Sequence, residues 1–473
     1  MTAVALAPVP HSALVVGLAV TGEAVARQLV QRGHHVVAAD DRPGPAMRAA
    51  ATSLGIELVE SPSPELLESL VAAAGVVLPS PGVPAHHRVF EVAARRGVPV
   101  WSEFELAARW SDVPVVAITG TNGKTTVTTL VTEMLAAAGK ATIAAGNTDV
   151  PLVDVGDRDL DVVVVEASSF RLQLTDSFRP AVATWLNLSE DHLDWHPSMA
   201  AYTAAKARIW AAQTSDDVAV ANADDPVVAA EAACAPASVH WFSLLGPQPP
   251  GPPDGPSSAG RWWWWDRVAG VLVGPDGPFV EVARLPRHLP HDLANALAAS
   301  ATAVAAGASA AVCAEVLTGF CGLAHRVALV ARADGVGWYD DSKATTPASV
   351  LAAVAGFASV VLLAGGRNKG LDLSVLGAGV PPVRAVVAIG EAAPEVSHAF
   401  AGRGVPVHPA GSMAEVVDTA AALAAPGDSV LLSPGCASFD WYHDYTERGD
   451  DFCRLVLSRA GAEPAPVQRG GGH

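Results

Sequence analysis

Short runs of branched apolar residues alternate with alanine-rich stretches along most of this sequence. The runs have the length of buried strands, and the stretches between them have the composition of helices. Strands that alternate with helices form βαβ units, in which helices cover parallel strands on both faces. We therefore predict an α/β fold built from largely parallel sheets. The predicted strands are Leu14–Val16, Val36–Ala39, Val76–Leu78, Val115–Ile118, Val162–Val165, Val360–Leu363, Ala385–Ile389 and Ser429–Leu432.

A glycine-rich loop follows the fourth of these strands. The segment VVAITGTNGKTTVTTLV leads from the strand into a predicted helix from Thr125 to about Ala138. The loop would wrap backbone N–H groups around an anion at the positive end of that helix. Lys124 would meet the outer phosphates of a nucleotide, and the Thr125 hydroxyl would face Mg²⁺. The predicted nucleotide-binding residues are Gly120, Thr121, Asn122, Gly123, Lys124, Thr125 and Thr126.

The loop departs from the full Walker pattern at one position. That pattern has a glycine five residues before Gly123, where this chain has Ile118. The alternative interpretation is a glycine turn that only caps a helix. The preceding strand and the Gly-Lys-Thr order favour nucleotide phosphate binding instead.

Length, composition and net charge indicate a multidomain acidic protein. A chain of 473 residues is too long to fold around a single hydrophobic core, so about three domains are expected. Half of the residues are hydrophobic and the mean hydropathy is +0.30, which is enough to bury a large core. The 48 acidic and 30 basic residues give a net charge of −18, which argues against nucleic acid or an anionic membrane as partner. The amino-terminal residues show no cleavable signal.

Five cysteines show neither a C-x-x-C pair nor disulfide-like spacing, so we expect a reducing cytoplasm. The uncharged stretch Leu293–Ala314 is long enough to span a bilayer, but it is mostly alanine and carries scattered polar residues. We interpret it as packed helices of a soluble protein, with a break at Gly307. A cytoplasmic enzyme, expected to be a monomer, fits these features.

Three domains are predicted, with boundaries at 1–102, 103–322 and 323–473. The middle domain contains a Pro/Gly/Ser-rich stretch followed by Trp262–Trp265, which we interpret as a peripheral insertion at about 245–266. Neighbouring strand residues point to opposite faces, so two of the four tryptophans should face solvent or a neighbouring surface. The tail 461–473 is expected to be disordered.

The first strand leads into a turn that resembles a Rossmann opening, LVVGLAVTGEAVARQLV. Ala19 replaces the middle glycine, which weakens the case for NAD but leaves nucleotide binding open. A tight turn of any doubly wound sheet is the alternative. The segment LPSPGVP follows another strand end, where ligands of such sheets bind.

Acidic and histidine residues follow the strands of the middle domain. Glu166 ends a strand next to that of the phosphate loop, where a carboxylate suits Mg²⁺. His192 lies among acids in NLSEDHLDWH and, taken alone, would be an ordinary solvated histidine.

The third domain carries polar loops after its strand-like runs. They are WYDDSKATTP, LAGGRNKGLD and LLSPGCASFDWYHDYTERGDDF, and each alone could be a surface turn. Together they gather Lys343, Thr345, Lys369 and Ser438 into a predicted site for an anionic small molecule.

Eight motifs in this order resemble the Mur ligases of peptidoglycan synthesis, and the resemblance is strongest to the branch that adds D-glutamate. The resemblance runs from about Gly17 to Phe452. The motifs are GTNGKTT, VEASSF, NLSEDHLDWH, AAKARIW, GLAHR, DSKAT, GGRNKG and SPGCASFD.

The resemblance implies three domains: a Rossmann-like N-terminal domain, a central ATPase-like domain with a parallel sheet, and a Rossmann-like C-terminal domain. It also implies a reaction. ATP phosphorylates the carboxylate of UDP-N-acetylmuramoyl-L-alanine, and the amine of D-glutamate then captures the acyl phosphate. Positioning and charge compensation would carry the catalysis.

The motifs also assign roles to residues of this chain. Lys124 would stabilise the transferring phosphoryl group, and Thr125 with Glu166 would hold one Mg²⁺. His192 and Lys206, the latter as a carbamate, would support a second Mg²⁺. By the same resemblance Asn295, Arg326 and Asp341 lie near ATP, and the substrate-binding residues are Val20, Thr21, Asp41, Arg42, Ser80, Gly82, Asn147, Lys343, Thr345, Lys369, Ser438 and Tyr445.

Two positions depart from the pattern of the family. Asp292 stands where asparagine is expected, beside the predicted adenine pocket, and Tyr445 stands where phenylalanine is expected. Two other functions stay open. One is a nucleotide-dependent regulator without amide chemistry, and the other is a folate-polyglutamate type of ligase, against which the UDP-binding first domain argues.

Overall fold

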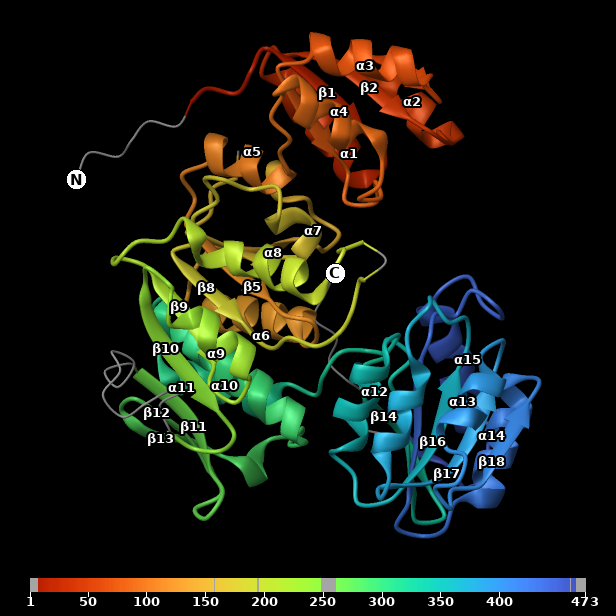
Figure 1. Cartoon of the computed structure of the whole chain (residues 1–473). Coiled ribbons are helices and arrows are strands. Elements are labelled where there is room, and N and C mark those ends of the chain that lie inside the picture. Colours follow the sequence, from red (N-terminus) through yellow and green to blue (C-terminus); the bar gives the residue numbers. More distant parts are fainter. Residues whose placement is uncertain (1–6, 157, 194, 248–260, 460, 465–473) are drawn as a thin grey trace. The chain divides into compact units, whose positions relative to one another are not determined.

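A computed structural model describes residues 7–156, 158–193, 195–247, 261–459 and 461–464. The chain forms two compact units (Figure 1). The first unit consists of Met1–Leu188, His192–Glu281 and Asn295–Leu317, and the second of Ser189–Asp191, Val282–Ala294 and Thr318–His473. The first unit contains two sheets and the second contains one.

The N-terminal sheet has four parallel strands in the order β3-β2-β1-β4. Alternate residues of β1 enter two different cores: Ala13 and Val15 pack in one, and Leu14 and Val16 in the other. The strand order reverses at β1, so ligands are expected at its carboxyl end. The elements are β1 (Ser12–Val16), α1 (Val20–Gln31), β2 (His35–Asp40), α2 (Pro45–Leu54), β3 (Glu57–Glu60), α3 (Pro64–Ala73), β4 (Val76–Pro79) and α4 (Arg88–Arg96).

The central sheet has nine strands in the order β13-β12-β11-β10-β9-β8-β5-β7-β6. Its strands from β6 to β11 are parallel, and β12 and β13 add an antiparallel edge. The strands are β5 (Val115–Thr119), β6 (Thr142–Gly146), β7 (Val162–Glu166), β8 (Val182–Trp185), β9 (Val218–Asn222), β10 (Ser238–Ser243), β11 (Arg261–Asp266), β12 (Val271–Gly274) and β13 (Gly277–Glu281).

The helices that accompany this sheet include α6, which begins at the phosphate loop, and α7 and α8, which carry candidate site residues. They are α5 (Glu103–Trp110), α6 (Lys124–Ala137), α7 (Ser169–Leu172), α8 (Met199–Ala211) and α9 (Pro226–Ala232), followed along the chain by α10 (Pro290–Ala305) and α11 (Ala310–Gly319). The uncharged stretch therefore forms two helices. They are separated around Gly307, whose φ is +100°, as predicted. In the described part of the chain, no helix has the length and apolarity needed to cross a bilayer.

The tryptophan run differs from the expectation. It forms β11, which pairs in parallel with β10 inside the sheet, and the assignment of 245–266 to an insertion stays a prediction. Trp263 is buried and packs against Phe279, whereas Trp262 is partly covered by Trp241. None of the four is exposed, because residues on both faces of the strand cover them. Most of the Pro/Gly-rich stretch, 248–260, lies outside the described residues.

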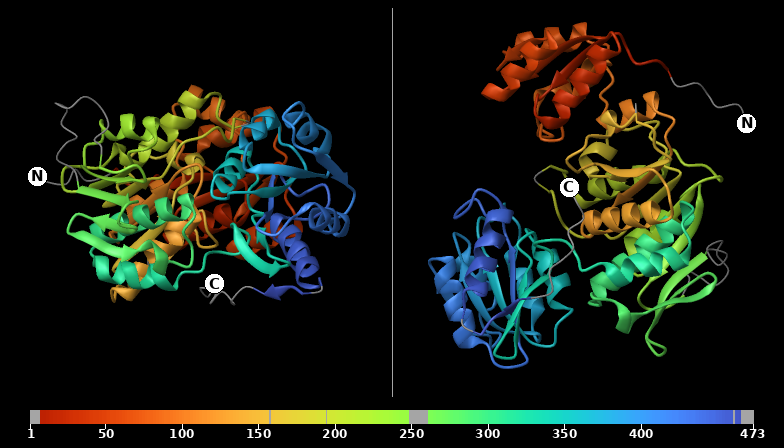
Figure 2. Two further views of the ribbon diagram at one scale, coloured as in Figure 1. Left: turned by 90° about the horizontal axis from the view of Figure 1, so that it is seen from below. Right: turned by 180° about the vertical axis from the view of Figure 1, so that it is seen from behind.

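The C-terminal sheet has seven strands in the order β18-β17-β16-β19-β15-β14-β20. Val360 and Leu362 of β16 pack with α12 and α13, while Val361 and Leu363 pack with α14 and α15. Both helix layers can be followed in Figure 2. The elements are β14 (Ala328–Ala333), β15 (Val336–Asp340), α12 (Pro347–Val354), β16 (Val360–Gly365), β17 (Val383–Ile389), α13 (Ala393–Ala399), β18 (Val407–Ala410), α14 (Met413–Leu423), β19 (Ser429–Gly435), α15 (Tyr445–Leu457) and β20 (Glu463–Pro464).

The end of the chain corrects another expectation. Residues Glu463 and Pro464 form β20, which pairs with β14, although disorder was predicted from 461 onwards. Backbone hydrogen bonding to β14 orders these two residues, and 465–473 lie outside the described residues. All eight predicted strands are confirmed, each within three residues of its predicted ends. The predicted domain boundaries stay predictions.

Candidate active site

The phosphate loop joins the carboxyl end of β5 to the start of α6. Gly123 precedes the helix with φ +85°, and a Cβ there would lie 2.6 Å from Asn295 Oδ1 and 3.3 Å from the Leu186 side chain. Glycine is required here for both its conformation and its size. The first-turn N–H groups of α6 therefore line a loop suited to an anion.

A residue that sequence reasoning missed holds this loop. Asn187 accepts a hydrogen bond from the N–H of Asn122 through its side-chain oxygen, at 2.9 Å, and its Nδ2 donates to the Asn122 carbonyl at 3.1 Å. Its backbone carbonyl also accepts from the N–H of Thr121. Asn187 opens the motif NLSEDHLDWH, in which only His192 was predicted to have a role.

Two lysines converge on one carbonyl of the loop. Lys124 Nζ donates to the carbonyls of Gly120 and Thr121, both at 2.8 Å, and Lys206 Nζ, on α8, donates to Gly120 at 2.8 Å. Lys206 is 1 % exposed and its Nζ lies 4.7 Å from the centroid of the Tyr202 ring. A carbamate at Lys206 would keep one N–H on this nitrogen, so the bond to Gly120 is compatible with that modification.

Glu166 ends β7, which neighbours β5, as the sequence predicted. It is 3 % exposed, and its Oε1 accepts a hydrogen bond from Asn147 Nδ2 at 2.8 Å. Its Oε2 is buried and has no hydrogen-bond partner among the described residues. A buried carboxylate oxygen without a donor is costly unless a cation binds it.

These residues fit Mg²⁺, which takes hard oxygen ligands and keeps several waters or phosphate oxygens. The Glu166 carboxylate supplies one such oxygen, and Thr125 lies in the first turn of α6. Across the described ranges, no group of three or more His, Cys, Asp and Glu side chains forms a metal cluster. A site completed by nucleotide phosphates needs no such cluster.

His192 has a left-handed backbone, with φ +55°. Its ring packs edge-on against Phe170, with 4.8 Å between the ring centroids, and Phe170 also stacks on His196. His196 in turn contacts the Tyr202 ring. His192 and His196 are therefore packed against side chains of α7 and α8, contrary to what a histidine in an acidic loop would suggest on its own.

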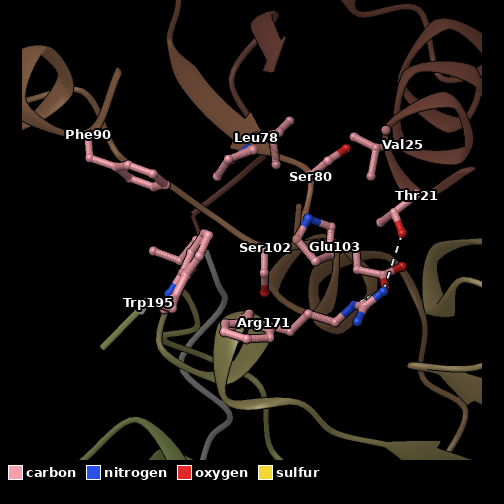
Figure 3. Close-up of a pocket in the computed structure, with 14 residues that line it drawn as sticks. Thr21, Val25, Leu78, Ser80, Phe90, Ser102, Glu103, Arg171 and Trp195 are labelled. Atoms are coloured by element: carbon pink, nitrogen blue, oxygen red, sulfur yellow. Dashed lines mark hydrogen bonds and ion pairs between the residues drawn. The ribbon is translucent and has the colours of Figure 1, made fainter. Parts of the chain in front are cut away.

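Arg171, on α7, links three parts of the first unit. Its Nε donates to Glu103 Oε1 at 2.7 Å, its Nη1 to Asn147 Oδ1 at 3.0 Å and its Nη2 to Thr21 Oγ1 at 3.3 Å. Figure 3 shows the guanidinium between Thr21 and Glu103, with Ser80 and Trp195 on the wall of the same pocket. Burial raises the pKa of Glu103, and the Arg171 charge opposes that rise.

Sequence reasoning missed Arg171, Glu103 and Trp195, although it placed Thr21 and Ser80 in a substrate site. The hydrogen bonds of Asn147 explain why Arg171 matters. Its guanidinium holds the Asn147 oxygen, so the Asn147 amide presents its nitrogen to Glu166. The chain of contacts runs from the N-terminal sheet to the candidate metal ligand.

The other predicted residues of the N-terminal sheet lie around the carboxyl ends of its strands. Ser80 is buried and donates to the Gly17 carbonyl at 2.6 Å. Asp40 accepts from the N–H groups of Leu18 and Arg42, so it shapes the turns that carry the predicted residues. The remaining predicted residues of this sheet, Val20, Asp41, Arg42 and Gly82, are exposed.

In the second unit a buried acidic pair, Asp340 and Asp341, lies at the carboxyl end of β15. Asp341 accepts from Ser433 Oγ at 2.7 Å and from the N–H of Val327, and burial raises its pKa to about 7. Asp340 Oδ2 lies 2.6 Å from His325 Nδ1, and this hydrogen bond raises the pKa of His325. The hydrogen bond to Asp340 thus favours the protonated form of His325.

The predicted amino-acid-binding residues of the second unit lie on loops of one sheet. Lys343 Nζ is 3.7 Å from the centroid of the Tyr445 ring, and the Lys343 N–H donates to the His325 carbonyl. Ser438 is buried, Thr345 is partly buried and Lys369 is exposed. Lys343 and Tyr445 are therefore brought into direct contact, across about a hundred residues of sequence.

Asp292 and Tyr445, the two departures from the family pattern, both contact other residues in the structure. Asp292 accepts from Arg287 Nε at 2.9 Å, and the same guanidinium donates to the carbonyls of Arg326 and Val327. Asp292 thus anchors an arginine that holds the segment containing Arg326. Tyr445 offers an aromatic face to Lys343, which phenylalanine would also offer.

Three family models match the chain. They are described as "Mur ligase MurD-like, N-terminal domain" for residues 11–102, "Mur ligase middle domain" for 118–303 and "Mur ligase, glutamate ligase domain" for 325–436. These ranges correspond to the three sheets.

Curated relatives match over nearly the whole chain. A protein of Frankia casuarinae is 42 % identical over 95 % of this chain and 94 % of its own length. One of Desulfosudis oleivorans is 41 % identical over 94 % and 95 %, and one of Myxococcus xanthus is 40 % identical over 94 % and 97 %. Each is named UDP-N-acetylmuramoylalanine--D-glutamate ligase.

Solved structures show the same fold at lower identity. A pseudomurein peptide ligase type C from Methanothermus fervidus has a TM-score of 0.56 at 18 % identity and covers 89 % of this chain and 96 % of its own. UDP-N-acetylmuramate-alanine ligase from Thermotoga maritima has a TM-score of 0.55 at 17 % identity, covering 94 % and 99 %. The three domain matches and the relatives above 40 % identity show that the chain belongs to the Mur ligase family.

Proposed function

We propose that this chain joins D-glutamate to UDP-N-acetylmuramoyl-L-alanine in an ATP-dependent reaction of peptidoglycan precursor synthesis. The observation that carries the proposal is the match of 40 to 42 % identity, over at least 94 % of both chains, to relatives with that named activity. The site supports it with a phosphate loop, a buried carboxylate beside it and a separate set of loops bearing Lys343, Thr345 and Ser438.

The reaction has two balanced steps. A carboxylate oxygen of the nucleotide substrate attacks the γ-phosphorus of ATP, the bond to the β-phosphate oxygen breaks, and ADP leaves. The amine of D-glutamate then attacks the acyl carbon, the bond to phosphate breaks, and an amide and inorganic phosphate form with loss of a proton. The protein supplies positioning and charge compensation for both steps.

Lys124 is assigned to the transferring phosphoryl group. It now donates to two neutral carbonyls of its own loop, and phosphate oxygens are stronger acceptors because they are charged. Exchanging these partners costs little rearrangement, since the carbonyls belong to the loop that receives the phosphates. The loop N–H groups and Asn187, which fixes them, would orient the nucleotide.

Two Mg²⁺ ions are part of the proposal, and bound Mg²⁺ would neutralise charge on the phosphates. Thr125 and Glu166 would hold one ion, which the partnerless Oε2 of Glu166 supports. His192 and the Lys206 carbamate would support the other. Asn147 and Arg171 keep the Glu166 carboxylate in one orientation.

We further propose that the chain acts as a monomer in the cytoplasm. Its five free cysteines are in keeping with a reducing compartment. The N-terminal match to a "Mur ligase MurD-like" domain favours this function over a folate-type ligase. A nucleotide-dependent regulator without amide chemistry would not need amino-acid-binding residues such as Lys343 and Ser438.

The test supplies UDP-N-acetylmuramoyl-L-alanine, ATP and Mg²⁺ and measures phosphate release with a panel of amino acids. We expect release that requires D-glutamate, together with an amide product of matching mass. Release without any amino acid, or with L-alanine or a diamino acid in preference, would contradict the proposed substrate.

A further inference from the structure

A buried arginine of the second unit lies behind the predicted amino-acid-binding loops. Arg448, on α15, is 2 % exposed. Its Nε donates to Ser342 Oγ at 2.9 Å, its Nη2 to the Ser342 carbonyl at 2.7 Å and its Nη1 to the Cys436 carbonyl at 3.2 Å. One rigid guanidinium therefore holds two loops that are far apart in sequence.

Each loop that Arg448 holds carries predicted amino-acid-binding residues. Ser342 is the residue before Lys343, and Cys436 lies two residues before Ser438. Shifting either loop would move these side chains directly. The guanidinium thus fixes the spacing between Lys343 on one loop and Ser438 on the other.

A third loop joins the same arrangement. The backbones of Arg367 and Ala437 exchange two hydrogen bonds, at 2.9 and 3.0 Å, and Lys369 follows two residues after Arg367. Gly366, with φ +126°, makes this approach possible. A Cβ there would lie 2.4 Å from the Ala437 carbonyl and 3.3 Å from Arg448 Nη1.

The start of α15 is also tied to this point. Ser342 Oγ donates to the Tyr445 carbonyl at 2.7 Å while it accepts from Arg448. Ser342 is completely buried, and its N–H donates to Asp340 Oδ1 at 2.9 Å. The Tyr445 ring, which contacts Lys343, is thereby held by the same hydrogen-bond network.

The charge of Arg448 has no direct ion pair within the ranges that the structure describes. Its three hydrogen-bond acceptors are neutral, and the nearby carboxylates of Asp440 and Asp340 act on it only through space. Burial lowers its pKa to about 10, so the group stays charged at neutral pH. Because all three acceptors are neutral, this buried guanidinium adds a positive charge behind the predicted amino-acid-binding loops, partly offset by Asp440 and Asp340.

We propose that Arg448 is the positioning residue of the amino-acid site: it locks the loops of Lys343, Lys369 and Ser438 together, and its charge favours an amino acid with two carboxylates. The inference rests on the proposed function and adds to it a residue that contacts no substrate. It explains why a charged residue is buried behind loops that already carry two lysines.

Kinetics of two variants test the inference. Arg448→Met keeps the length and apolar stem but removes charge and hydrogen bonds, and we expect the KM for D-glutamate to rise about 10- to 100-fold. The KM for ATP should change by no more than about two-fold, because the phosphate loop does not depend on Arg448. Arg448→Lys keeps the charge but cannot reach all three acceptors. Its KM for D-glutamate should therefore lie between the values for the unaltered chain and for Arg448→Met.

Arg454→Gln is the matched control, since Arg454 lies on the same helix and is exposed, pairing with Asp451. We expect its kinetics to equal those of the unaltered chain. An Arg448→Met enzyme with an unchanged KM for D-glutamate would overturn the inference. An equal rise of all KM values, with no recovery in Arg448→Lys, would show a purely structural role and would also overturn it.

Amide hydrogen exchange gives a readout that is independent of turnover. Exchange of residues 343–345 and 367–369 should be faster in Arg448→Lys and Arg448→Met than in Arg454→Gln, and equal rates would contradict the inference. If Arg448→Met does not fold, exchange at the same residues is measured in Arg448→Lys and Ser342→Ala. Faster exchange in these two variants than in Arg454→Gln supports the inference, and equal rates contradict it. Should the unaltered chain prefer another amino acid, the proposed function fails, but the variants are compared with that amino acid and Arg448 is still tested.

Discussion

The phosphate loop of the central sheet is one continuous segment of sequence, whereas the predicted amino-acid-binding residues of the C-terminal sheet lie on separate loops that a distant helix holds together. Lys124 donates to Gly120 and Thr121, four and three residues away. Ser342 and Arg448 meet across 106 residues. The residues predicted to bind phosphate therefore lie in one short segment, which Asn187 and Lys206 hold from a distance, whereas those predicted to bind the amino acid are brought together only by tertiary packing.

This difference matches the chemistry of the two ligands. Phosphates are recognised by backbone N–H groups and one lysine, which a short glycine-rich segment supplies by itself. An amino acid with two carboxylates needs side chains at fixed separations, and loops alone do not keep such separations. The buried guanidinium of Arg448 supplies the missing rigidity.

The largest expected effect is on the phosphate side. Lys124→Ala should lower kcat by about a thousand-fold, because it removes a positive charge aimed at the transferring phosphoryl group. Phosphate release at saturating substrates measures this. Lys140→Ala is the control, since Lys140 lies after α6 and outside the candidate site. A loss in Lys124→Ala of less than about ten-fold would break the assignment of this residue.

Two glycine variants sharpen the comparison. Gly123→Ala brings a Cβ against Asn295, and Gly366→Ala brings one against the Ala437 carbonyl. Strain of this kind is worth about 1–3 kcal/mol, or roughly 5- to 150-fold. We expect Gly123→Ala to weaken nucleotide binding alone and Gly366→Ala to raise the KM for D-glutamate alone. Both variants affecting both ligands would show that the two regions are not independent.

The pH dependence of stability tests the C-terminal side. Folding raises the pKa of Asp341 from 3.8 to about 7, so the folded state binds more protons and stability falls as pH rises from about 4 to 7. The loss amounts to at most about 4 kcal/mol for a shift of this size. Asp341→Asn should flatten this fall in urea unfolding at pH 5 and pH 7.

Asp418→Asn serves as the control for that measurement, because Asp418 is an exposed carboxylate on α14 of the same unit. Its pH dependence should equal that of the unaltered chain. An Asp341→Asn protein whose stability still falls as steeply between pH 5 and pH 7 would show that burial of Asp341 is not the cause.

The smallest expected effect concerns the aromatic contact of Lys343. Tyr445→Phe keeps the ring beneath the ammonium, so the KM for D-glutamate should be unchanged, whereas Tyr445→Leu should raise it about two- to five-fold. Steady-state kinetics with D-glutamate as the varied substrate measures both. Equal values for the two variants would mean that the cation–π contact does not position Lys343.

The parts of the fold that local sequence determines could be predicted. Branched apolar runs such as Val162–Val165 gave the strands, and the helix after the phosphate loop began within one residue of Thr125. The burial of the tryptophan run was not predicted, because it depends on Trp241 and Phe279 of other strands. Nothing within the run itself signals those neighbours.

The site shows the same limit. Glu166 and Lys124 carry motifs, so their positions were predicted, whereas Asn187, Arg171 and Arg448 act through hydrogen bonds to distant segments. Arg448 lies in TERGDD, which looks like a solvated stretch of helix. Its burial follows only from the convergence of α15 with the loops after β15 and β19.

The central claim is that the phosphate loop activates a carboxylate for capture by D-glutamate. The most direct measurement follows ¹⁸O from the carboxylate of UDP-N-acetylmuramoyl-L-alanine during turnover with ATP and D-glutamate. Activation as an acyl phosphate transfers one ¹⁸O atom to the released inorganic phosphate, which is the result we predict. Inorganic phosphate that contains no ¹⁸O would contradict the account.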